Sequence, residues 1–155
     1  MKEVNIYTDG ACSGNPGVGG FGTILDYKGV EKEISCGYTL TTNNRMELMA
    51  AICGLESLNE PCKVTLFSDS QYVVNAINQK WLFGWVRANF IDTKTKKERV
   101  NADLWRKLYR QIGRHDVTFV WVKGHDGHPQ NERCDRLAVA AIGQKPLKTD
   151  ELYKN

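Results

Sequence analysis

The sequence predicts an α/β fold built on a five-stranded mixed sheet with helices on both faces. Three strand-like segments with short connections open the chain, which favours an antiparallel meander. Strand-like and helix-like segments then alternate, which favours parallel crossovers that lay helices against the sheet. The 155 residues suit a single hydrophobic core, and no internal repeat or linker divides them.

The first three strands are short apolar segments bounded by turn residues. The first covers residues 3–9 and ends at Asp9 and Gly10. Residues 11–20 are rich in Gly, Ser, Asn and Pro, so we expect a loop there. Strands over residues 21–27 and 31–39 follow, joined by a short glycine turn.

The later elements are marked by apolar side chains at helical spacing and by two short apolar runs. Leu48, Ile52 and Leu55 fall on one stripe of a helix over residues 44–58. The elements that follow are a strand at 63–68, helices at 71–79, 81–88 and 101–113, a strand at 117–122 and a helix at 131–142.

The composition indicates a soluble, monomeric protein of the cytoplasm with one domain over residues 1–143. No apolar run approaches the ~18 residues that span a membrane, and the N-terminus turns polar too quickly for a secretory signal. The five cysteines are scattered without a C-x-x-C pair, which argues against a disulfide framework and a zinc ribbon. We expect a flexible tail over residues 144–155, because Pro146 and several charges follow the last helix.

The charges of the chain are unevenly distributed. Residues 80–114 hold ten of the 21 Lys and Arg residues but only three of the 18 Asp and Glu residues, so the rest of the chain is net acidic. A basic stretch of this kind either meets a polyanion such as nucleic acid or is a solvated helix face, and charge alone does not decide.

Four acidic residues stand at the ends of predicted elements. Asp9 and Asp69 end two strands that, as parallel neighbours, would deliver both carboxylates to one edge of the sheet. Glu47 opens the first helix, and Asp135 lies in the first turn of the last one. Each position also has a structural alternative, namely a turn, a capping box, a helix cap or a favourable place at a helix N-terminus.

If the four carboxylates converge, they form a site for divalent cations. Crowded carboxylates repel one another, and oxygen ligands suit Mg²⁺ or Mn²⁺ and not zinc. Two such ions about 4 Å apart activate water and stabilise a leaving oxygen in phosphoryl transfer. An acidic pocket beside a basic surface therefore favours a nuclease.

Four segments carry more specific information: IYTDGACSGNPGVGGFG at 6–22, TTNNRMELMAA at 41–51, FSDSQYV at 67–73 and WVKGHDGHPQNERCD at 121–135. They closely resemble ribonuclease H of the bacterial type 1 family, in the order and spacing of that family. The resemblance implies the ribonuclease H-like fold. It also implies an endonuclease that hydrolyses the RNA strand of RNA–DNA hybrids by two-metal-ion catalysis and leaves 5′-phosphate and 3′-hydroxyl ends.

The resemblance further implies roles for individual residues. Two Mg²⁺ ions, for which Mn²⁺ can substitute, would be held by catalytic carboxylates: Asp9, Glu47, Asp69 and Asp135. His125 resembles a loop histidine that assists proton transfer or product departure, and Glu132 an acid that helps product release. Contacts to the RNA strand are implied for Asn15, Asn43 and Gln71, and contacts near the DNA strand for Thr42 and Asn44. The implied substrate-binding handle contains Trp81, Trp85, Lys94, Lys96 and Lys97.

Two positions depart from the family pattern. The segment VRANFID after Trp85 carries few basic residues, so we expect weaker hybrid affinity and a smaller salt dependence than a fully basic handle gives. Asp126 follows His125 where a small residue is usual, and a neighbouring carboxylate raises a histidine pKa.

Two other functions are compatible with parts of the same pattern. A hybrid-binding module without catalysis is one alternative, although clustered acids beside phosphate do not help a pure binder. A nuclease domain of a larger reverse transcriptase or transposase is another, whereas the start at Met1 and the short complete core favour a free-standing enzyme.

Some patterns point to structure and not to chemistry. Gly17-x-Gly19-x-x-Gly22 matches a dinucleotide fingerprint, but a strand follows it instead of a helix. A zinc site at His125, His128 and Cys134 lacks a fourth ligand. We expect His115 at the surface, and Trp105 and Trp121 in the core.

Overall fold

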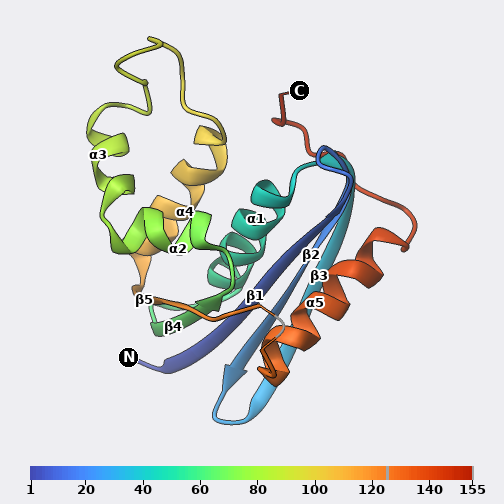
Figure 1. Ribbon diagram of the computed structural model, residues 1–155. Helices are drawn as coiled ribbons and strands as arrows, with labels where there is room; N and C mark the ends of the chain where they lie inside the picture. Colours follow the sequence, from blue (N-terminus) through green and yellow to red (C-terminus); the bar gives the residue numbers. More distant parts are fainter. Residues whose placement is uncertain (125, 155) are drawn as a thin grey trace.

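The fold is described here from a computed structural model, for residues 1–124 and 126–154 (Figure 1). Its strands are β1 (Glu3–Ser13), β2 (Gly17–Tyr27), β3 (Val30–Thr41), β4 (Lys63–Ser68) and β5 (Asp116–Trp121). Its helices are α1 (Asn43–Glu56), α2 (Gln71–Asn78), α3 (Trp81–Arg87), α4 (Ala102–Arg114) and α5 (Pro129–Ile142).

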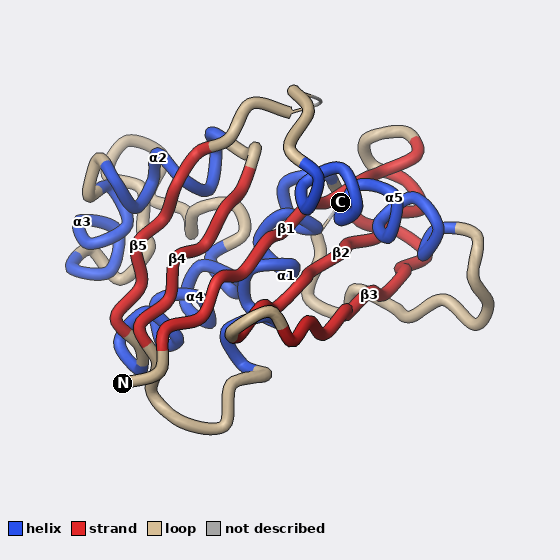
Figure 2. The backbone as a smooth tube through the Cα atoms, turned by 90° about the horizontal axis from the view of Figure 1, so that it is seen from below, coloured by secondary structure: helices blue, strands red, loops and turns tan. Residues whose placement is uncertain are grey.

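The five strands form one mixed sheet in the order β3-β2-β1-β4-β5 (Figure 2). β1 pairs with β2, and β2 with β3, in antiparallel register, whereas β1 with β4 and β4 with β5 pair in parallel. The predicted five-stranded mixed sheet is therefore confirmed, and β1 is the strand at which its antiparallel and parallel halves meet.

Helices cover both faces of the sheet, as predicted. α5 lies alone on one face, over β1, β2 and β3, while α1 lies on the other with α2, α3 and α4 beside it (Figure 1). The main core fills the layer beneath α1 and α4, where Leu48, Leu66 and Leu108 are fully buried. Among the described residues, no helix combines the length and apolar content that crossing a membrane requires.

The loop predicted over residues 11–20 is wrong. β1 and β2 continue as one long hairpin in which Cys12 lies opposite Gly19, and only residues 14–16 make the turn. One of the glycines that suggested a loop, Gly20, instead lets a helix approach the sheet, because a Cβ there would lie 2.6 Å from the carbonyl oxygen of Ala138 in α5. A close helix crossing and a turn leave the same glycine-rich signature in sequence.

Three smaller expectations are also corrected. His115 is buried and not at the surface, because its ring lies between the end of α1 and the start of β4, where its Nδ1 accepts a hydrogen bond from the Cys62 backbone N–H at 3.0 Å. Trp105 is buried as expected, but Trp121 is 43% exposed because it ends the edge strand β5. The last helix begins at Pro129, two residues earlier than predicted.

The C-terminal tail makes contacts with the rest of the domain. Lys148 forms a parallel bridge with Tyr38 of β3, and Asp150 is hydrogen-bonded to Thr41 and Arg45. The flexibility expected of residues 144–155 stays a prediction, while these contacts bring the middle of the tail to the start of α1.

Candidate active site

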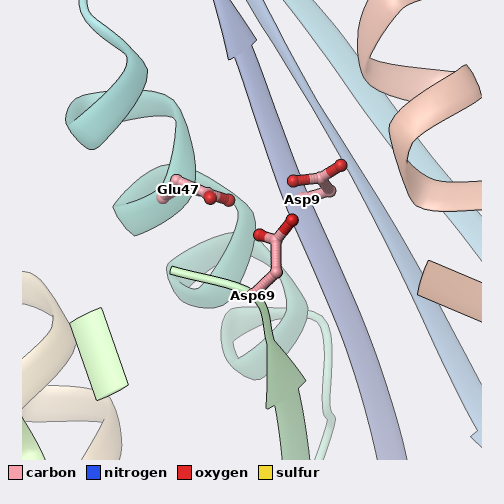
Figure 3. Close-up of side chains that lie close together, drawn as sticks. All are labelled: Asp9, Glu47 and Asp69. Atoms are coloured by element: carbon pink, nitrogen blue, oxygen red, sulfur yellow. The ribbon is translucent and has the colours of Figure 1, made fainter. Parts of the chain in front are cut away.

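Three carboxylates from separate elements converge where β1 and β4 stop pairing. The parallel ladder ends at Thr8 and Ser68, so Asp9 and Asp69 emerge side by side at the carboxyl end of β4. Glu47 reaches the same point from the second turn of α1 (Figure 3). Each of these three residues offers one carboxylate oxygen, and the three oxygens lie within 4.8 Å of one another.

The structural alternatives for these acids do not hold. Thr42 caps α1 by accepting a hydrogen bond from the Arg45 backbone N–H, and Ser70 caps α2 in the same way. Asp9 lies within β1 and not in a turn. The three carboxylates therefore do not cap the helices, and they point toward one another.

Asp135 joins this site less closely. It lines the same cavity of about 400 Å³ as the other three acids, yet it lies outside their tight group. Its predicted place in the first turn of the last helix is wrong, because α5 starts at Pro129 and Asp135 is its seventh residue. The described lining of this cavity holds four acids and no Lys or Arg: Asp9, Gly10, Asn43, Asn44, Glu47, Asp69, Ser70, Gln71, Tyr72 and Asp135.

The crowding disfavours negative charge on the buried acids. Burial, followed by the negative charges of Asp69 and Asp135, raises the pKa of Asp9 to about 8. Burial and the charges of Asp9 and Asp69 hold the pKa of Glu47 well above its usual range. The hydrogen bond that Asp9 accepts from the Gly10 backbone N–H at 3.0 Å opposes this effect and favours ionisation.

The donor set fits a divalent cation. Glu47 is 4% exposed, and its Oε1 is buried without a hydrogen-bond partner among the residues that the structure describes. An orphaned, desolvated acceptor costs free energy unless a donor or a cation satisfies it. Clustered carboxylate oxygens are the ligands that Mg²⁺ and Mn²⁺ prefer, and a cation removes the repulsion that raises the pKa values.

We expect Mg²⁺ to raise the melting temperature more at pH 8 than at pH 5. The folded-state pKa of Asp9 lies above its ordinary value of 3.8, so without metal its contribution to stability is present below about pH 4 and lost as the pH rises through 8. A cation competes with fewer protons at the higher pH. Circular dichroism melts in Mg²⁺ and in chelator, at matched ionic strength, measure the difference, and an equal shift at both pH values contradicts this expectation.

Gly124 lies close to the carboxylate of Asp69. A Cβ at this position would lie 2.8 Å from Oδ2 of Asp69, which is the far end of a side chain and not rigid backbone. Gly124→Ala should therefore lower kcat between about 10- and 100-fold by displacing that carboxylate, with a melting temperature close to wild type. Gly113→Ala is the matched control, because a Cβ there meets no atom within 4 Å. An unchanged kcat in Gly124→Ala would mean that Asp69 tolerates the displacement.

The residues expected to contact nucleic acid lie around the acidic cavity. Asn43, Asn44 and Gln71 line it, and Asn15 accepts a hydrogen bond from the Asn43 backbone N–H at 3.1 Å. A neighbouring cavity of about 550 Å³ is lined by Asn15, Asn44 and Thr42. Glu132 is half-buried in the first turn of α5, and His125 falls outside the described residues.

The expected handle is α3 with the loop that follows it. Trp81 is 52% exposed, whereas the ring of Trp85 packs edge-on against Trp105 at 5.4 Å between centroids. The guanidinium of Arg99 lies 5.2 Å from the centre of the Trp85 ring, so that Trp85 is partly covered. The exposed cations of the loop are Lys94, Lys96 and Lys97. The weaker salt dependence expected of this handle stays a prediction.

Sequence reasoning missed three residues near the site: Tyr72, Asn101 and Arg45. Tyr72 lines the acidic cavity, and its hydroxyl accepts hydrogen bonds from Asn101 at 3.0 Å and Trp105 at 3.1 Å. Arg45 is buried in the first turn of α1 and also donates a hydrogen bond to the side-chain oxygen of Asn101. These partners are separated by up to 56 residues, so no local pattern announces them. The one available signal was a charged residue inside the apolar stripe of a helix.

Comparisons with known proteins agree with this geometry. The model of the RNase H family matches residues 1–143. A protein named Ribonuclease H from Rippkaea orientalis is 56% identical over 154 residues, which are 99% of this chain and 94% of that protein. One from Desulforamulus reducens is 57% identical over 150 residues, 97% and 94% of the two chains.

Solved structures give the same result. LC9-RNase H1, described as a type 1 RNase H with the type 2 active-site motif, superposes with a TM-score of 0.81 at 30% identity, over 92% of this chain and 73% of that one. LC11-RNase H1, solved in complex with an RNA/DNA hybrid, gives a TM-score of 0.65 at 26% identity, over 90% and 96% of the two chains.

Proposed function

The chain belongs to the RNase H family and is accordingly an endonuclease that cuts the RNA strand of RNA–DNA hybrids, and we propose that two Mg²⁺ ions serve this reaction. Four carboxylates would hold the ions: Asp9, Glu47, Asp69 and Asp135. Mn²⁺ would substitute, because the same oxygen ligands suit it. The products we propose carry 5′-phosphate and 3′-hydroxyl ends.

One observation carries the proposal. Three oxygens from Asp9, Glu47 and Asp69 lie within 4.8 Å of one another in a cavity whose described lining offers no cation of its own. When bound there, Mg²⁺ supplies an activated water for attack on phosphorus and charge stabilisation for the departing ribose oxygen. A protein that only binds nucleic acid gains nothing from a cluster of carboxylates, because their negative charges repel phosphate.

The chain's other residues would orient the hybrid. Asn43 and Gln71 lie beside the carboxylates, and their amide groups both donate and accept, as contact with a 2′-hydroxyl requires. The exposed lysines of the handle loop would hold backbone phosphates without regard to base sequence. Selection for RNA in the cut strand would thus come from the amides, and affinity from the lysines.

Two further roles belong to the proposal. His125 would move a proton or help the product leave, and Glu132, at the start of α5, would help product release. A monomer acting in the cytoplasm is proposed from the composition.

A cleavage assay tests the proposal. The protein is incubated with labelled RNA–DNA hybrid, duplex RNA and duplex DNA, each with Mg²⁺ and with chelator. We expect cleavage of the hybrid's RNA strand alone, only with metal, and with 5′-phosphate ends. Binding of the hybrid without cleavage would support a binding module instead, and cleavage in chelator would contradict the role of the carboxylates.

A further inference from the structure

The C-terminal tail extends past the family-matched residues 1–143 and docks onto the domain. The Thr39 backbone N–H donates to the carbonyl of Lys148 at 2.9 Å, and the Lys148 N–H donates to Gly37 at the same distance. The tail therefore adds a short stretch of pairing to the outer edge of β3. In Figure 1 it leaves α5 and crosses to the end of the sheet at which α1 begins.

Asp150 fastens the tail at that point. Its side chain is 5% exposed and accepts hydrogen bonds from the Thr41 hydroxyl at 2.7 Å and from Nε and Nη2 of Arg45 at 2.7 and 2.9 Å. A buried carboxylate with this many donors is held in one place. The tail's position is thus fixed to the end of β3 and the start of α1.

Arg45 also binds residues at the start of α4, and so links that helix to Asp150. It is 2% exposed and donates to both carboxylate oxygens of Asp103, at 2.9 and 2.7 Å, and to the side-chain oxygen of Asn101 at 3.2 Å. Its guanidinium also lies 5.8 Å from the ring centre of Tyr153. One buried cation therefore joins α1, α4 and the tail.

These three segments, together with Asn15 and residues 98–100, line one cavity. The cavity of about 550 Å³ adjoins the acidic one, and Asn44 lines both. The acids in its lining are engaged, since Glu98 pairs with Arg106 and Asp103 with Arg45. The full lining is Asn15, Thr42, Asn44, Arg45, Glu98, Arg99, Val100, Asn101, Ala102, Asp103, Leu152, Tyr153 and Lys154.

We propose that the tail over residues 148–154 is one wall of the hybrid-binding surface, with Lys154, which lines this cavity, in contact with a backbone phosphate of the hybrid. Asp150 is then a positioning residue, because it acts through Arg45 on the walls that carry Thr42 and Asn101. Because this cavity adjoins the acidic one, a single RNA–DNA duplex can contact both cavities at once. This inference rests on the proposed function, since it names the nucleic acid of that reaction as the ligand.

The test compares Lys154→Gln and Asp150→Asn with Lys32→Gln, an exposed lysine near the opposite end of β3. Hybrid binding is measured in chelator across a range of salt concentrations, and kcat and KM in Mg²⁺. Lys154→Gln should weaken binding severalfold, make the slope of log K against log salt shallower by about 0.9, and leave kcat unchanged. Asp150→Asn should raise KM about fivefold with kcat within about twofold, because the walls lose their alignment. Lys32→Gln should change neither.

The contrary outcomes are distinct. If Lys154→Gln gives the slope and affinity of Lys32→Gln, the tail does not touch the hybrid. If Asp150→Asn lowers the melting temperature but leaves KM unchanged, its role is structural only. Should Asp150→Asn fail to fold, Thr41→Val removes one donor to Asp150 and keeps the Arg45 pairs, and it should raise KM in the same direction. Wild-type protein that binds hybrid without cutting it contradicts the proposed function alone, whereas wild-type protein that does not bind hybrid contradicts both.

Discussion

The Asp69→Asn variant should lose hybrid cleavage by on the order of 10³-fold in kcat, yet become more stable when no metal is present. Asp69 faces Asp9 and Glu47, and its charge contributes to the raised pKa of each. Removing that charge deprives a cation of a ligand and, in the metal-free protein, removes a repulsion from the fold. Loss of function and gain of stability would then have one physical cause.

Two measurements separate these effects. Single-turnover cleavage of the hybrid in Mg²⁺ gives the loss in rate, and thermal melts in chelator give the change in stability. Asp116→Asn is the matched control, since it makes the same substitution at an exposed position on β5. Activity above about a tenth of wild type would remove Asp69 from the site, and a lower melting temperature in chelator would show that repulsion does not govern the cluster.

The Gly22→Ala variant should be destabilised by about 3 kcal/mol and should also lose activity. A Cβ on Gly22 would meet the Cys134 carbonyl oxygen and lie 2.6 Å from the Leu137 Cβ, and neither belongs to the far end of a flexible side chain. α5 must therefore move away from the sheet. Gly22 lies directly opposite Asp9 in the β1–β2 pairing, and Asp135 follows Cys134, so the displacement reaches both acids.

Chemical unfolding and hybrid cleavage on the same preparation check this expectation. Gly143→Ala, at the end of the same helix, is the control, because its Cβ would meet the nearest atom at an ordinary 3.7 Å. If Gly22→Ala unfolds at the wild-type denaturant concentration, α5 does not depend on the glycine for its approach. If it is destabilised but retains full kcat, the position of α5 does not set that of the acids.

Most of the fold could be predicted because its signals are local. The stripe of Leu48, Ile52 and Leu55 lies on one helix, and the apolar run at residues 63–68 is the strand β4. The hairpin over residues 11–20 could not be recognised, since the need for glycine at Gly20 comes from α5, more than a hundred residues away. The burial of His115 has the same origin, because its ring meets backbone groups of Cys62 and Leu55.

The acidic residues of the candidate site could be predicted from the sequence. Asp9, Glu47 and Asp69 follow from their predicted places near element ends together with the family resemblance, and the structure brings them together although β1 continues four residues past Asp9. The supporting residues were not predictable in this way. Arg45 is meaningful only beside Asp103 and Asp150, and sequence separation conceals that neighbourhood. A buried cation with two distant carboxylates leaves no periodic pattern.

The point at which β1 leaves β4 has a mechanical consequence. Main-chain pairing between the two halves of the sheet runs only from Glu3 to Thr8 on β1, and beyond it β1 continues with β2 alone. Asp9 and Asp69 each follow the last residue of their strand that takes part in this pairing. A cation bound to both carboxylates would link β1 to the end of β4. Metal binding would therefore also oppose separation of the two halves of the sheet.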